Sequence, residues 1–175
     1  STRVSSYAGY RHALSRFVGS LQDLHLRVNF SLLPATYQWP GFQLVYRGGR
    51  YLAVSSQGSA HSGQEVTHCD GRPLAEWANQ VAAYEQIIPG LESTGNWAGP
   101  LVLRDSGSPF IPRPRSCTIG GRDVVLDWQP VAASRFAANR RAATVFNDRV
   151  AAVAPFGADG AWVRMGFFAP QTQAE

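Results

Sequence analysis

The chain has 175 residues, of which 45% are hydrophobic and 16% are charged, a balance that suits one globular domain with an appended arm. No apolar run approaches the roughly 20 residues that a membrane-spanning helix needs. The net charge is +4, every basic residue is an arginine, and the arginines form no cluster interleaved with aromatic residues, which argues against nucleic-acid binding.

The first predicted element is a helix over residues 7–26, whose apolar residues recur at steps of three and four. These residues are predicted to share one face: Tyr10, Leu14, Phe17, Val18, Leu21 and Leu24. Ser5 or Ser6 can cap the start of this helix. The alternating pattern of residues 26–32 predicts a strand. Pro34 and Pro40-Gly41 then indicate a boundary.

The middle of the chain is predicted to be rich in strands. The hairpin 42–55 turns at Arg47-Gly48-Gly49-Arg50, because glycine supplies the positive φ angles of such turns. Further strands are predicted at 64–69, 101–104, 117–119 and 124–128, and the stretch 91–100 is predicted to be a Gly-rich, polar connection. One amphipathic helix is predicted over 72–88, with Pro73 in its first turn. Its apolar stripe comprises Leu74, Trp77, Ala78, Val81, Tyr84 and Ile88.

The last third of the chain is less regular. Residues 132–150 are rich in Ala and Arg and are predicted to form a helix or a linker, and residues 161–168 resemble a strand. The predicted fold class is α+β: a helical arm at 1–34, then a small, partly open β-barrel with one helix at 35–131, then a linker and strand at 132–175.

The two cysteines, Cys69 and Cys117, allow one disulfide and have no metal-ligand spacing. We expect two separate buried thiols. A disulfide is the alternative, and it would indicate an oxidising compartment. His61 and His68 are not expected to form a metal site.

The most informative segment is G-Q-E-V-T-H-C-D-G-R-P-L, from Gly63 to Leu74. It resembles the G-D-x-I-x-x-V-D-G-x-P-V segment of PDZ domains in bacterial proteases. The matching residues are Gly63, Val66, Asp70, Gly71, Pro73 and Leu74; Gln64 replaces the usual Asp, and Cys69 replaces the usual Val. The alternative is any strand-turn-helix unit with an Asp-Gly turn.

The resemblance implies a peptide groove between a strand edge and the helix after the Asp-Gly turn, filled by strand addition. We expect the groove strand at 42–46 and the groove helix at 74–88. The expected peptide-binding residues are Gly41, Phe42, Leu44, Tyr46, Trp77, Val81 and Tyr84. Trp39-Pro40-Gly41-Phe42 resembles the loop that receives a ligand's C-terminal carboxylate on backbone amides; the alternative is an ordinary Pro-Gly turn.

The segment Asp23-Leu24-His25-Leu26 resembles the D-x-H-(T/S) segment of carboxy-terminal processing (tail-specific) proteases and their tricorn-like relatives. In the members that use a Ser–His arrangement, the His of this region is the base, so the resemblance implies that role for His25. Leu26 departs from the usual hydroxyl residue. The alternative is an ordinary polar His at a helix end.

No nucleophile accompanies this histidine. Lys is absent, and no G-x-S-x-G elbow is present. The chain begins with Ser1 rather than Met, so we expect a fragment of a longer protein. The resemblance to these proteases implies a periplasmic or secreted location.

The predicted function is therefore a PDZ-like region that presents polypeptide to, or gates, the core of a serine endopeptidase. We expect it to bind a polypeptide or protein C-terminus and the catalytic core of the same protein, without nucleic acid, metal or cofactor. The alternative is a stand-alone PDZ-like scaffold or assembly module without protease activity.

Overall fold

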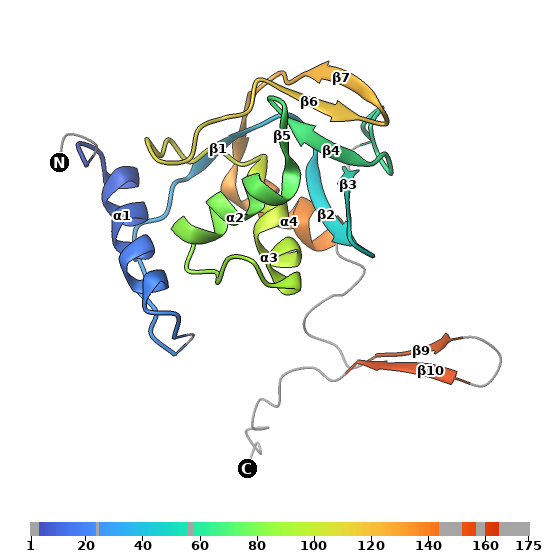
Figure 1. Ribbon diagram of the computed structural model, residues 1–175, viewed down its shortest axis with the longest axis horizontal. Coiled ribbons are helices and arrows are strands. Elements are labelled where there is room, and N and C mark those ends of the chain that lie inside the picture. The colour runs from blue at the N-terminus through green and yellow to red at the C-terminus, as the bar shows by residue number, and fades with distance from the viewer. Residues whose placement is uncertain (1–3, 24, 56–57, 144–151, 157–159, 165–175) are drawn as a thin grey trace, which may run out of the picture. The chain divides into compact units, whose positions relative to one another are not determined.

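The computed structural model describes residues 4–23, 25–55, 58–143, 152–156 and 160–164 (Figure 1). The chain divides into two compact units, Ser1–Ala143 and Thr144–Glu175. Within the described residues, four helices accompany several antiparallel sheets, none of them closed. The fold class is therefore mixed α+β with a partly open barrel, as the sequence predicts.

The arm begins with helix α1, Tyr7–Ser20, and the Ser6 hydroxyl caps it by accepting a hydrogen bond from the Gly9 amide at 3.0 Å. The helix is shorter than predicted because Gln22, at φ 53°, turns the chain out of the helical region. The strand predicted at 26–32 is wrong, since these residues join no sheet of the described chain. Instead, the Gln86 side chain bonds both main-chain groups of Val28, at 2.8 and 2.9 Å.

The predicted hairpin is confirmed as β2, Gln43–Arg47, and β3, Arg50–Val54. Gly48 and Gly49 have φ angles of 55° and 79°, which fit the two-residue turn that matches the right-handed twist of the strands. This local turn chemistry explains why the hairpin could be predicted from sequence.

Strand β4 is Val66–Cys69. Glu65, the residue before it, forms an isolated antiparallel bridge with Leu52 of β3. The sheet has the order β5-β4-β6-β7, with β5 at Arg72–Pro73, β6 at Ser116–Ile119 and β7 at Arg122–Val125. The carboxylate of Asp70, in the turn between β4 and β5, accepts hydrogen bonds from the amides of Arg115 and Ser116. The Asp-Gly turn is therefore tied to the neighbouring strand.

Cys69 and Cys117 form a disulfide, so the expectation of two separate thiols is wrong. The register of β4 and β6 places the two residues directly opposite each other. Both side chains are buried in the core. The two cysteines are separated by 48 positions in the sequence, and their pairing could not be predicted because it depends on a long-range strand register.

A further sheet was not predicted. It pairs β1, Thr36–Trp39, with β8, Gln129–Ala132, so that the chain before the hairpin meets the chain after the four-stranded sheet. Helix α4, Ala133–Ala143, follows β8, and the main-chain carbonyl of its Phe136 accepts a hydrogen bond from the Gln43 side chain.

Two helices separate β5 from β6. Helix α2, Leu74–Tyr84, starts at the predicted place but ends early, because Gln86 has a φ of 56°. Helix α3, Glu92–Val102, replaces the predicted strand at 101–104, and this prediction is wrong. A short apolar run such as Leu101–Leu103 fits a strand and a buried helix equally well, and only packing decides between them.

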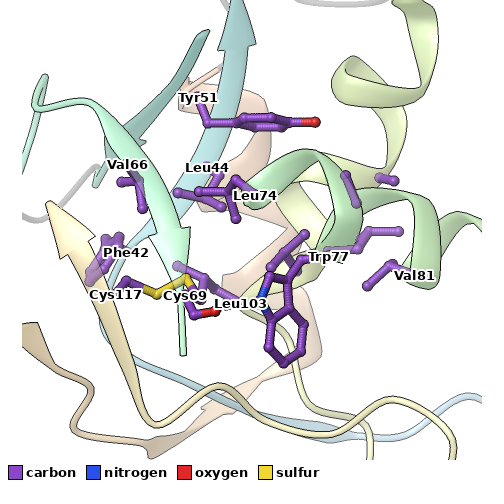
Figure 2. Close-up of a cluster of buried hydrophobic side chains, with 14 of the residues drawn as sticks. Phe42, Leu44, Tyr51, Val66, Cys69, Leu74, Trp77, Val81, Leu103 and Cys117 are labelled. Carbon is purple, nitrogen blue, oxygen red and sulfur yellow. Dashed lines mark hydrogen bonds between the residues drawn. A yellow bond between two sulfur atoms is a disulfide. The ribbon is translucent and has the colours of Figure 1, made fainter. Parts of the chain in front are cut away.

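The core lies between the sheets and helices α2 and α3 (Figures 1 and 2). Figure 2 shows Trp77 and Val81 of α2 on one side of the cluster, with Leu103 beside Trp77, and the disulfide and Phe42 on the other side. Of the helices that the structure describes, none combines the length and the apolar character needed to cross a bilayer.

The second unit contains an antiparallel hairpin of β9, Ala152–Phe156, and β10, Gly160–Arg164. The strand predicted at 161–168 coincides with β10 as far as Arg164, and its remainder lies outside the described residues. In the segment 132–150, predicted as helix or linker, α4 is helical to Ala143, and the residues from 144 to 150 lie outside the described part of the chain.

Candidate functional site

Four of the predicted peptide-binding side chains lie together, but inside the core (Figure 2). Phe42, Leu44, Trp77 and Val81 are all buried, Leu44 with an exposed fraction of 0%. The indole of Trp77 donates a hydrogen bond to the carbonyl of Cys69 at 2.8 Å. In this structure these side chains line no open surface, and their role in binding peptide stays a prediction.

The predicted groove residues Tyr84 and Gly41 lie elsewhere. The Tyr84 ring stacks on Phe110 at 5.4 Å, and its hydroxyl accepts a hydrogen bond from Arg16 of the arm. Gly41 has a φ of 83°, and its carbonyl accepts a hydrogen bond from the Ser55 hydroxyl. Tyr84 therefore contributes to the junction with α1.

An open pocket of about 280 Å³ lies between the β2–β3 hairpin, α2 and the start of α3. Its lining comprises Tyr46, Gly49, Tyr51, Ala75, Asn79, Gly90, Leu91, Glu92, Thr94 and Gly95. Of the predicted peptide-binding residues, Tyr46 alone lines this pocket. Its volume lies just below the roughly 300–1,000 Å³ that is typical of small-molecule sites.

Side-chain hydrogen bonds hold the wall that joins α2 to α3. The Asn79 carboxamide accepts a hydrogen bond from the Gly90 amide at 2.9 Å. The Thr94 hydroxyl donates to the Ile88 carbonyl at 2.7 Å and accepts from the Leu91 amide at 3.1 Å. The connection therefore has a defined path although it lies at the surface.

Helix α3 packs closely against two tyrosines of the hairpin. A Cβ atom on Gly95 would lie 2.6 Å from the Tyr46 ring, and one on Gly99 would lie 3.0 Å from the Tyr51 ring. The two rings are 5.0 Å apart. Burial, with a smaller contribution from Tyr46, raises the pKa of Tyr51 to about 12, so its phenol stays neutral. Glycine at these two positions lets α3 lie against the hairpin.

The arm meets the domain through a buried charged cluster. The carboxylate of Glu85 bonds His12 of α1 at 3.2 Å and also pairs with Arg104. Burial raises the pKa of Glu85, but the hydrogen bond from His12 and the charge of Arg104 outweigh burial and hold the pKa below its ordinary value of 4.5. The Arg104 guanidinium lies over the Tyr37 ring, 5.0 Å from its centroid.

His25 lies in the turn after α1, and its side chain is 98% exposed. Its Nδ1 lies 3.0 Å from the Asp23 carboxylate, which also accepts the His25 amide at 2.9 Å. The structure therefore places the predicted base at the surface, with its other ring nitrogen open to solvent. No serine of the described chain makes a hydrogen bond to this imidazole.

Most of the pocket was not predicted, because four of its lining residues lie in the stretch 91–100, which the sequence predicts as a Gly-rich, polar connection. The available signal was Glu92, an acidic residue suited to the first turn of a helix. In the described part of the chain, no three His, Cys, Asp or Glu side chains come together as metal ligands do.

The fold and the pocket define a mixed α+β domain with a helical arm, a partly open barrel and an open pocket beside α2. No protein-family model matches this sequence, and no curated protein sequence matches it. Among solved structures, the chain is similar to the crystal structure of mature CPAF, with 19% sequence identity and a TM-score of 0.49 over 73% of this chain. The chain spans about a quarter (26%) of the CPAF chain. A likeness of this degree does not establish a family or a function.

Proposed function

We propose that this chain is a polypeptide-binding and gating region of a serine endopeptidase of the carboxy-terminal processing or tricorn-like kind, whose nucleophile lies outside these 175 residues. Two segments support the proposal by their resemblance to that family: Gly63–Leu74 and Asp23-x-His25. The disulfide supports a periplasmic or secreted location, because such bonds persist in oxidising compartments.

The pocket beside α2 is the structural observation that carries the proposal. It lies between the end of the β2–β3 hairpin and helix α2, which follows the Asp-Gly turn, and it shares Tyr46 with the peptide groove that the resemblance implies. Tyr46 and Tyr51 supply aromatic surface, and Asn79 and Glu92 supply polar groups. An extended polypeptide can place a side chain here while its main chain lies over the hairpin end.

We expect helix α3 to limit how much of strand β2 a polypeptide ligand can reach. Strand addition along the whole of β2 needs free main-chain groups, and Leu44 is completely buried. Because α3 packs against the tyrosines of this hairpin, we expect the first ligand contact at the open Tyr46–Gly49 end and longer pairing only after α3 moves. The helix then controls how much of β2 a substrate can reach.

The test fills the pocket without disturbing the core. Ala75 is exposed and lines the pocket, whereas the neighbouring Glu76 is exposed and does not line it. Ala75→Trp should weaken binding of fluorescein-labelled β-casein, an unfolded polypeptide, by at least about tenfold, equal to about 1.4 kcal/mol. Glu76→Trp is the matched control and should bind as the unmodified chain does, both measured by fluorescence anisotropy.

Equal casein affinity in Ala75→Trp, Glu76→Trp and the unmodified chain would contradict the proposal, because the pocket would then not be the binding site. Equal unfolding midpoints of the two variants would show that both are folded.

A further inference from the structure

The turn after α1 contains an exposed carboxylate–imidazole pair. Asp23 and His25 are two residues apart, and the carboxylate oxygen of Asp23 lies 3.0 Å from Nδ1 of the imidazole. The same oxygen accepts the His25 amide at 2.9 Å, so one carboxylate holds both the main chain and the ring.

This contact favours one of the two ring nitrogens as the site of the proton. A carboxylate accepts hydrogen bonds, so a neutral imidazole bonds Asp23 only when its proton is on Nδ1. Nε2 then keeps its lone pair and, on a side chain that is 98% exposed, faces solvent. A general base needs this arrangement: one nitrogen held by an orienting group and the other free to take a proton.

The turn is held against the rest of the domain. Gln86 bonds both main-chain groups of Val28, three residues beyond His25. Gln22, Asp23, Leu26 and Arg27 lie against residues 86–88 around a cavity of only about 10 Å³, which has room for at most one water. The carboxylate therefore sits on an anchored segment.

We propose that Asp23 is a positioning residue that holds the His25 imidazole in its Nδ1–H form, so that this chain presents Nε2 as a ready base to a nucleophile supplied by another domain. The presentation to a nucleophile rests on the proposed function; the positioning itself does not. Asp23 acts through His25 and need not touch substrate.

The first experiment uses this chain alone. Nitrogen-15 chemical shifts of the histidine rings, measured above the pH at which they lose their charge, report the tautomer directly. We expect the Nδ1–H form for His25, and Asp23→Ala should return His25 to the mixture shown by His68. His68 is an internal reference, because its exposed ring has no partner among the residues that the structure describes. The same tautomer mixture at His25 and His68 in the unmodified chain would overturn the inference.

The second experiment uses an active protease that includes this chain. His25→Ala should abolish cleavage, and Asp23→Ala should lower kcat by about 10- to 100-fold with little change in KM, as expected when a group assists only the chemical step. Unchanged kcat in Asp23→Ala, with cleavage lost in His25→Ala, would overturn the positioning role alone. Unchanged cleavage in His25→Ala would instead overturn the base that the proposed function assigns, whatever the tautomer.

Discussion

Helices α1 and α2 pack against each other with opposite kinds of surface. Helix α2 buries an apolar stripe: Leu74, Trp77, Ala78, Val81 and Ala82. Helix α1 buries Gly9, Arg11, His12 and Ser15 and leaves Tyr10 and Phe17 exposed, Phe17 with an exposed fraction of 63%. Hydrophobic burial therefore holds α2, whereas hydrogen bonds and ion pairs hold the arm. The domain should resist changes that release α1.

The largest expected effect comes from a substitution in the buried apolar face of α2. Trp77→Ala removes a side chain that is 3% exposed and leaves the Cys69 carbonyl without its indole partner. We expect the free energy of unfolding to fall by about 3–5 kcal/mol, measured by urea denaturation. Trp97→Ala is the matched control, since Trp97 is 65% exposed, and should change it by less than about 0.5 kcal/mol. Similar losses in both variants would contradict the assignment of Trp77 to the core.

The disulfide should have the next largest effect. Replacing Cys69 and Cys117 together by Ala opens a loop closed over a separation of 48 residues, and we expect a loss of about 2–4 kcal/mol. Reduction of the unmodified chain should lower its unfolding midpoint to a similar extent. A midpoint that does not respond to reductant would show that the two thiols are not joined in solution.

Helix α1 should dock less tightly on the domain at acid pH, or when the Glu85 carboxylate is removed. Because the folded pKa of Glu85 is lowered, its stabilisation is fully present above pH 4.5 and is lost as the pH falls through the lowered value. Glu85→Gln should weaken arm docking by about 1–3 kcal/mol at neutral pH and abolish this acid dependence. Hydrogen exchange of α1 amides measures both effects, with the amides of α2 as the reference. Equal protection of α1 at pH 3 and pH 6 would contradict this account.

The smallest expected effects come from two glycines. Gly95→Ala places a Cβ 2.6 Å from the Tyr46 ring, so strain should exceed the gain in helix propensity and lower stability by about 1–2 kcal/mol. Gly19→Ala in α1 meets its nearest atom at 3.5 Å and should raise stability by about 0.5–1 kcal/mol. Thermal unfolding of both variants measures the difference. A stabilising Gly95→Ala would show that α3 does not pack closely on the hairpin.

Local features were predictable from the sequence. The hairpin at Gly48-Gly49 and the apolar stripe of α2 depend on turn chemistry and periodicity, and both are confirmed. Helix α3 was not predictable in this way, because Gly95, Gly99 and Pro100 have low helix propensity and packing against two tyrosines overrides it.

The candidate site was harder to predict than these local features, because most of it is formed by residues far apart in the sequence. Periodicity identified the apolar face of α1 but could not show that the polar residues face the domain, since this depends on Glu85 and Gln86, far along the chain. The pocket likewise unites the hairpin with the α2–α3 connection. The Asp23–His25 contact, in contrast, spans two residues and is a local turn that a sequence can suggest.

The Gln86 side chain has a consequence for the length of the arm connection. A carboxamide has an NH2 donor group and a carbonyl acceptor side by side, with the spacing of a peptide unit, so Gln86 bonds both main-chain groups of Val28 as one residue of a neighbouring strand would. Two paired strands can slip past each other and form a new set of bonds, but a single amide offers no second register. The number of residues between His25 and Val28 therefore sets the distance of the imidazole from the end of α2. One residue inserted between them would move the imidazole without breaking the two hydrogen bonds between Gln86 and Val28.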